Sequence, residues 1–253
     1  MIEAVALLLV GVAAGALNAV GGGGTFVALP ALVAAGLPPV TANASTTVAL
    51  LPGAVTGTWA YRSQIRPVGA TTTRSLSIAS LLGGGCGAAL LLALPASSFD
   101  AAVPWLLAFA TLVLAFGRSL SRLLNAALRR TIDMGPRSVL VGQFLLAIYG
   151  GYFGGAVGIL MLALWSAGLG LDTAAGNPMR VAQLTAVNAI AAGIFLVAAD
   201  VLSHPVPLLA VLVGAAVGGF AGARLARHLS ARVLRALVLT TAATMTVLYF
   251  LKG

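Results

Sequence analysis

The sequence predicts an all-α membrane protein that crosses the bilayer several times and is built from two related halves. Of its 253 residues, 60% are hydrophobic and only 8% are charged, and several apolar runs reach the roughly 20 residues that a spanning helix needs. Glycine-rich interruptions at 21–24 and 150–158 fall at corresponding places in the two halves. We therefore expect two inverted repeats of about four apolar helical segments each, with a glycine-broken hairpin opening each repeat.

The basic charge of the chain fits a membrane topology better than a nucleic acid partner. The formal net charge is +9, but a soluble nucleic-acid-binding protein carries its basic residues on a charged surface, which this chain hardly has. Arginines gathered in cytoplasmic loops are what the positive-inside rule predicts. We expect the lipid bilayer as a partner and no nucleic acid.

The first half opens with the glycine run, which divides an otherwise apolar stretch. Each glycine inside a helix costs about 1 kcal/mol relative to alanine, so four in a row from Gly21 to Gly24 predict an interrupted helix. Glu3 argues against a cleaved secretory signal, whose first residues are basic. The predicted helical segments of this half are 2–20, 25–37, 42–61, 71–94 and 101–116.

A hydrophilic segment divides the chain. Residues 118–138 are rich in arginine, and we expect a basic cytoplasmic loop there, between a first transmembrane repeat at 1–117 and a second at 139–253. The predicted apolar segments of the second repeat are 139–171, interrupted by the glycines at 150–158, then 177–198, 205–223 and 233–251.

The two halves match each other at a nearly constant spacing. A shift of about 134 residues superimposes Gly21 on Gly155, Gly24 on Gly158 and Asn43 on Asn177. Glycine faces at 83–87 and 218–222 match at a spacing one residue larger. The pattern indicates an internal duplication. The glycine faces are expected to pack within the chain or to form the seam of a homodimer.

The distribution of arginines favours an inverted arrangement of the halves. If each broken segment is a hairpin that enters and leaves by one face, the arginine-bearing stretches 62–74, 118–137 and 224–235 all face the cytoplasm. Eight ordinary crossings would instead place the last of these stretches outside. We expect the hairpin arrangement, with both termini extracytoplasmic.

The breaks are the predicted ligand site. Half-helices beginning near Gly24 and Gly158 would offer unpaired N–H groups and a positive dipole end to an anion near the bilayer midplane. Glycines that only permit close helix packing are the alternative. The candidate binding residues are Asn18, Gly22, Gly23, Gly24, Thr25, Asn43, Thr46, Tyr152, Gly155, Gly158, Asn177, Arg180, Gln183 and Asn188.

Arg180 is the most informative charge in the sequence. Asn177 followed by Pro178 is typical of a helix N-cap and first helical position, which places Arg180 in the first turn. An arginine at membrane depth costs between about 2.5 and more than 10 kcal/mol unless it is paired or hydrated. A bound anion and snorkelling to the cytoplasmic headgroups are the two explanations that the sequence leaves open.

The residues that the chain lacks also narrow its function. His204 and His228 are the only histidines, and no acidic residue lies in the interior of a predicted spanning segment. A membrane protease or a carrier of transition metals is therefore not expected, nor is any enzyme, metal site or cofactor. Cys86 is the only cysteine, so no disulfide framework is expected.

Several motifs resemble the TauE/SafE sulfite exporter family over essentially the whole chain. They are the glycine run at 18–25, Ala28-Leu29-Pro30-Ala31-Leu32, Ala34-Ala35-Gly36-Leu37-Pro38-Pro39, and Tyr149-Gly150-Gly151-Tyr152-Phe153-Gly154. The resemblance implies a bacterial inner-membrane transporter for sulfite, organosulfonates such as sulfoacetate, or related small carboxylates. In the second motif the continuation Gly155-Ala156-Val157-Gly158-Ile159 is more apolar than is common in that family.

From these observations we expect a secondary transporter of a small anion that works by alternating access around the paired breaks. The sequence alone reaches only a small anion. An anion channel and a membrane scaffold that transports nothing are the alternatives.

Overall fold

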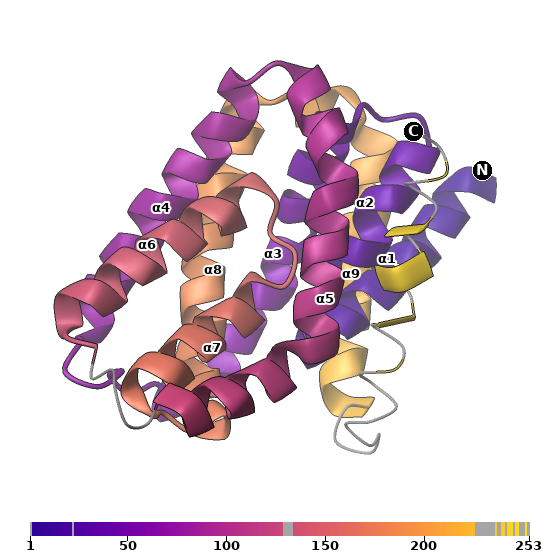
Figure 1. The fold of residues 1–253 in the computed structure, drawn as a ribbon. Coiled ribbons are helices and arrows are strands. Elements are labelled where there is room, and N and C mark those ends of the chain that lie inside the picture. The colour runs from indigo at the N-terminus through magenta and orange to yellow at the C-terminus, as the bar shows by residue number, and fades with distance from the viewer. Residues whose placement is uncertain are drawn as a thin grey trace.

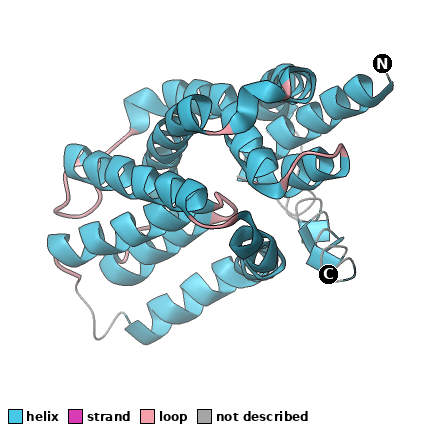
Figure 2. Cartoon of the chain, turned by 90° about the horizontal axis from the view of Figure 1, so that it is seen from above, coloured by secondary structure: helices cyan, strands magenta, loops and turns pink. Residues whose placement is uncertain are grey.

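The described part of the chain is helical throughout. The computed structural model describes residues 2–21, 23–128 and 134–225, together with 236, 239, 240, 242–244, 246, 247 and 251. Within these residues the only β pairing is an isolated bridge between Val68 and Thr71. Short loops join the helices (Figure 2). The expected all-α class is confirmed.

The elements follow one another in two comparable series (Figure 1). The first series is α1 (Ile2–Gly21), α2 (Thr25–Ala34), α3 (Pro39–Tyr61), the short η1 (Arg62–Gln64), α4 (Thr73–Ala93) and α5 (Ala96–Leu128). The second is α6 (Pro136–Tyr152), α7 (Val157–Leu169), α8 (Thr173–Ala198), the short η2 (Asp200–Ser203) and α9 (Pro205–Leu225). Most of the last predicted segment, 233–251, lies outside the described residues.

Helix lengths separate spanning helices from half-helices. Stretches at Thr73–Ala93, Ala96–Val113 and Ala175–Ala198 are long and apolar enough to cross a membrane. By contrast, α2 has 10 residues and α7 has 13. At 1.5 Å per residue they extend only about 15 and 20 Å, less than the roughly 30 Å hydrocarbon core. Each of these two helices is therefore too short to cross the hydrocarbon core by itself.

Several predicted boundaries differ from the structure. Asn177 was expected to cap a helix, but α8 begins a turn earlier, at Thr173. The reason is Asp172, whose Oδ2 accepts a hydrogen bond from the Ala175 N–H at 3.2 Å and so fills the capping role. Similarly, α3 begins at Pro39, because proline suits the first helical position. Finally, α5 continues as a helix through Leu128, into the region expected to be a loop.

Glycine faces join helices that are distant in sequence. α1 packs along α9, and α4 packs along α6. A Cβ on Gly11 or Gly15 of α1 would collide with backbone carbonyls of α9, and one on Gly83 or Gly87 would collide with carbonyls of α6. These glycines therefore allow direct backbone contact. Of the two roles expected for the face at 83–87, the described residues show packing within the chain.

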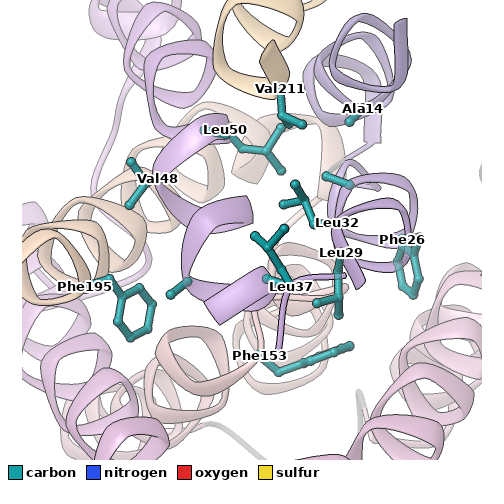
Figure 3. Packing of buried hydrophobic residues seen from close by; sticks show 14 of the residues in the cluster. Ala14, Phe26, Leu29, Leu32, Leu37, Val48, Leu50, Phe153, Phe195 and Val211 are labelled. Atoms are coloured by element: carbon teal, nitrogen blue, oxygen red, sulfur yellow. The ribbon is translucent and has the colours of Figure 1, made fainter. Parts of the chain in front are cut away.

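The main hydrophobic core surrounds α2 and α3 and reaches the second break. Phe26, Leu29 and Leu32 of α2 are completely buried in it. Figure 3 shows Phe153, from the connection between α6 and α7, lying beside Leu29 and Leu37. The core thus holds the two broken segments together.

Candidate functional site

The second break is shorter than the glycine pattern predicts. Gly150 and Gly151 belong to α6, so only residues 153–156 separate α6 from α7. Gly154 has a φ of 83° and Ala156 a φ of 58°, which are both left-handed. Ala156 precedes α7 and provides no side-chain cap. The first backbone bonds of α7 run from Ile159 and Leu160 to the Ala156 carbonyl, which leaves the N–H groups of residues 157 and 158 without a partner in the described part of the chain.

The helices α6 and α7 form a hairpin with the break at its tip. At the opposite end, the Met134 N–H donates to the Gly168 carbonyl at 3.0 Å. Midway along the hairpin, Gly142 of α6 faces the side chain of Leu164 of α7. Figure 1 shows α6 and α7 side by side, joined by the loop at the break. The end of α7 therefore lies beside the residue that precedes α6.

Arg180 lies against the first turn of α7. A Cβ placed on Gly158 would be 3.0 Å from Nη1 of Arg180 and 3.3 Å from its Cδ. Only 9% of Arg180 is exposed, so the side chain does not snorkel to the surface. Its Nε donates to Oδ1 of Asn177 at 2.9 Å, and no carboxylate of the described residues forms an ion pair with it. A buried positive charge, an asparagine and an open helix N-terminus thus lie together.

The first break has a different environment. Gly22 lies outside the described residues, while Gly23 and Gly24 are buried. A Cβ on Gly24 would be 2.6 Å from the Ala14 carbonyl, 2.9 Å from Cδ1 of Leu50 and 3.0 Å from Cβ of Asn18. The nearest neighbours of Gly24 are therefore backbone atoms and side-chain carbons. The nearest neighbour of Gly158, by contrast, is the guanidinium of Arg180. The two breaks, which match in sequence, are chemically unequal.

Polar residues of the first half touch the second break. Nδ2 of Asn43 donates to the carbonyl of Tyr152 at 3.0 Å. Oγ1 of Thr25, a buried residue, is 4.0 Å from the position that a Cβ on Gly154 would take. Oδ1 of Asn43 and Oγ1 of Thr46 are buried without a hydrogen-bond partner. α2 and α3 therefore approach the break from one side, and α8 approaches it with Arg180.

The remaining predicted residues do not all converge there. Gln183 belongs to a buried network in which Ser80 donates to it at 2.9 Å and Gln143 donates to Ser80 at 2.8 Å. This network joins α4, α6 and α8. Asn188 is partly buried and has no hydrogen bond to a described residue. Gly155 is buried within the break itself, and the ring of Tyr152 packs edge-on against Phe99.

Two features of this region escaped the sequence interpretation. The left-handed conformation of Ala156 has no sequence signal, because alanine rarely adopts it. Gln143 could have been found, since it is a polar residue inside an apolar helix, as Gln183 is.

Comparison with known proteins agrees with this architecture. A family model described as "Sulfite exporter TauE/SafE" matches residues 7–249, nearly the whole chain. No match was found among curated proteins or among solved structures. The family match covers both breaks and every helix that contributes to the site. The chain belongs to the sulfite exporter TauE/SafE family, whose members are membrane transporters rather than enzymes.

Proposed function

We propose that the protein is a secondary transporter that exports a small anion such as sulfite, an organosulfonate or a related carboxylate. Family membership supports a membrane transporter of the sulfite exporter type. The observation that carries the choice of an anion is the position of the Arg180 side chain, from α8, against the first turn of α7.

The electrostatics of this position favour a bound anion. The N-terminus of α7 carries roughly half a positive charge, and its unpaired N–H groups are anion donors. Arg180 adds a full positive charge, and its terminal nitrogens form no hydrogen bond to a described residue. A buried guanidinium without a carboxylate is costly, and an anion held between it and the helix end would offset that cost.

Alternating access between inverted repeats is the proposed mechanism. Under the sequence offset, α6 corresponds to α1 and α9 corresponds to α4. The two most extensive helix contacts, α1 with α9 and α4 with α6, are then equivalent pairs that each join one repeat to the other. The hairpin of α6 and α7 supports a segment that enters and leaves by one face. Rocking of one repeat against the other would expose the break to each side in turn.

The proposed orientation places the protein in the bacterial inner membrane with both termini outside. Arg62, Arg66 and Arg74 are exposed around the connection from α3 to α4, as cytoplasmic arginines should be. The guanidinium of Arg62 also lies 4.1 Å from the ring centre of Trp59, a pairing suited to the membrane interface.

Reconstitution in liposomes tests the proposal. Uptake of sulfite, 2-hydroxyethanesulfonate, sulfate and lactate would be measured with wild-type protein, with Arg180→Gln and with Arg74→Gln as an exposed control. We expect at least one anion to be carried with saturable kinetics and counterflow. Arg180→Gln should reduce that uptake at least about tenfold, and Arg74→Gln should leave it intact.

The outcomes separate the alternatives. Flux that never saturates and shows no counterflow identifies an anion channel. Well-folded protein that neither binds nor carries any of these anions, with no effect of Arg180→Gln, overturns the proposal and favours a scaffold.

A further inference from the structure

Asn43 carries a buried oxygen atom that has no partner. The residue is only 1% exposed. Its Nδ2 donates to the Tyr152 carbonyl at 3.0 Å, and because a carbonyl can only accept, the orientation of the amide is fixed. Oδ1 is then the remaining polar atom, and it is buried without a hydrogen-bond partner. A buried acceptor of this kind requires either a hydrogen-bond donor or a cation.

This oxygen lies beside the C-terminal end of α6. Tyr152, which Asn43 contacts, is the last residue of α6. The N–H groups of the next two residues both donate to the Tyr149 carbonyl, so the Gly150 carbonyl has no backbone partner within the described part of the chain. The C-terminal end of a helix also carries roughly half a negative charge. An anion would be repelled here, whereas a cation would be stabilised.

Two hydroxyl groups supply further oxygen atoms at the same break. A Cβ on Gly154 would be 3.4 Å from the Gly150 carbonyl oxygen and 4.0 Å from Oγ1 of Thr25, so both oxygens lie close to the same point. Thr46 follows Asn43 by one turn of α3, and its Oγ1 is buried without a partner. Neutral oxygen atoms from α2, α3 and α6 therefore lie around this end of α6.

The chemistry of these oxygens indicates a monovalent, hard cation. Transition metals prefer imidazole and thiolate ligands, and calcium and magnesium are bound through carboxylates. The described residues contain no group of three or more His, Cys, Asp or Glu side chains that could hold such an ion. Carbonyl oxygens at interrupted helices are instead the ligands that bind sodium in transporters with broken helices.

The position of this cation is separate from that of Arg180. Helices α3 and α8 meet where Oγ1 of Thr58 donates to Oγ1 of Thr185 at 2.8 Å and to the Val181 carbonyl at 3.4 Å. Asn43 precedes Thr58 by about four turns of α3. The guanidinium of Arg180, the neighbour of Val181 in sequence, therefore lies at another level of the bundle and does not occupy the cation position.

We infer that the C-terminal end of α6 binds a sodium ion, with Oδ1 of Asn43, Oγ1 of Thr25 and the Gly150 carbonyl among its ligands. The inference builds on the proposed function in one respect, which is that the bound cation favours binding of the anion at the start of α7. The two sites lie at opposite ends of one break, residues 153–156. Opposite charges attract strongly in an interior of low dielectric constant, so sodium is the coupling ion of transport.

Binding of radioactive sodium tests the site directly. Purified protein in nanodiscs would be titrated with the isotope while choline chloride holds the ionic strength constant. We expect saturable binding that unlabelled sodium displaces. Thr25→Val removes one oxygen and keeps the shape, so it should weaken sodium binding about tenfold. Thr47→Val is the matched control and should leave binding unchanged, because the Thr47 hydroxyl already donates to the Asn43 backbone carbonyl at 3.1 Å.

A gain of function tests the role of Asn43. Asn43→Asp adds the carboxylate that divalent cations require. We expect calcium chloride to raise the melting temperature of this variant and to leave that of the wild type unchanged. A variant that folds and shows no response to calcium would argue against a cation at this oxygen.

Coupling to the anion is measured on the same nanodiscs. The dissociation constant of 2-hydroxyethanesulfonate would be determined in sodium chloride and in choline chloride. We expect at least about fivefold tighter binding in sodium. Thr25→Val should abolish most of this difference, and Thr47→Val should preserve it.

Failure of this inference differs from failure of the proposed function. If no sodium binds and Thr25→Val has no effect, a buried water occupies the position beside Asn43, while an effect of Arg180→Gln on anions leaves the anion site in place. Equal anion affinity in sodium and choline overturns the coupling role. If sodium binds but no anion does, and Arg180→Gln has no effect, the cation site stands and the proposed function is wrong.

Discussion

The guanidinium of Arg180 and the backbone of Gly158 are in contact, so that a methyl group on Gly158 would come within 3.0 Å of Nη1. The contact crosses from α8 to the start of α7. Residue 158 is a glycine because a larger side chain there would occupy the space of the Arg180 guanidinium. Because the blocking atom is the mobile end of a long side chain, a larger residue at 158 should displace the charge more than it disturbs the fold.

Gly158→Ala is accordingly expected to weaken anion affinity about tenfold while the protein folds normally, because part of a charge-assisted hydrogen bond is lost. Titration of anion-dependent thermal stabilisation would measure the change. Gly193→Ala on α8 is the matched control, since a Cβ there has no neighbour within 4 Å. Unchanged affinity in Gly158→Ala would contradict contact between the anion site and this turn.

Ala156 offers a test of strain in the second break. Its φ of 58° costs an L-residue roughly 1–2 kcal/mol, a cost that glycine avoids. Ala156→Gly should therefore raise the free energy of unfolding by up to about 1 kcal/mol. Ala156→Val should lower it, because a β-branched side chain fits this conformation least well. Thermal denaturation of the two variants in the same detergent measures both signs, and a stabilising valine would refute the assigned backbone conformation.

The seam between α4 and α6 depends on Gly87. A Cβ there would collide with the Ile148 carbonyl and lie 2.8 Å from the Tyr152 nitrogen, so Gly87→Ala should destabilise the protein by about 1–3 kcal/mol. Gly85 on the same helix is the control, because its Cβ would meet only Ile190 and Ile194 at ordinary contact distances. Gly85→Ala should be neutral or stabilise by up to about 1 kcal/mol. Denaturation of both variants in detergent would compare them, and equal stabilities would rule out close packing at this seam.

The breaks were predictable because glycine acts locally. A run of glycines weakens a helix wherever it occurs, so Gly21 to Gly24 and the second glycine cluster marked the interruptions without knowledge of the fold. The extent of the second break was not predictable to the residue. Gly150 and Gly151 stay helical because they pack closely against Val187 and Gly84 of neighbouring helices. Tertiary contact there overrides propensity.

For Arg180, too, the sequence indicated the need for a partner but not which residues the side chain contacts. Its unusual position in an apolar sequence indicated a partner, but the contact with Gly158 depends on how α7 and α8 pack. Gln183 was placed in the same site because it lies three residues from Arg180. In the structure its Oε1 accepts a hydrogen bond from Ser80 on α4, a contact that sequence spacing does not encode. The helix start was misjudged for a simpler reason, because Asp172 is an equally good cap one turn before Asn177.

The hydrogen bond between the Met134 N–H and the Gly168 carbonyl ties the start of α6 to the end of α7. At the other end of the α6–α7 hairpin is the first turn of α7, which the Arg180 side chain contacts at Gly158. We therefore expect α6 and α7 to move together. A change in the position of Met134 is therefore expected to shift α7 and the turn beside Arg180.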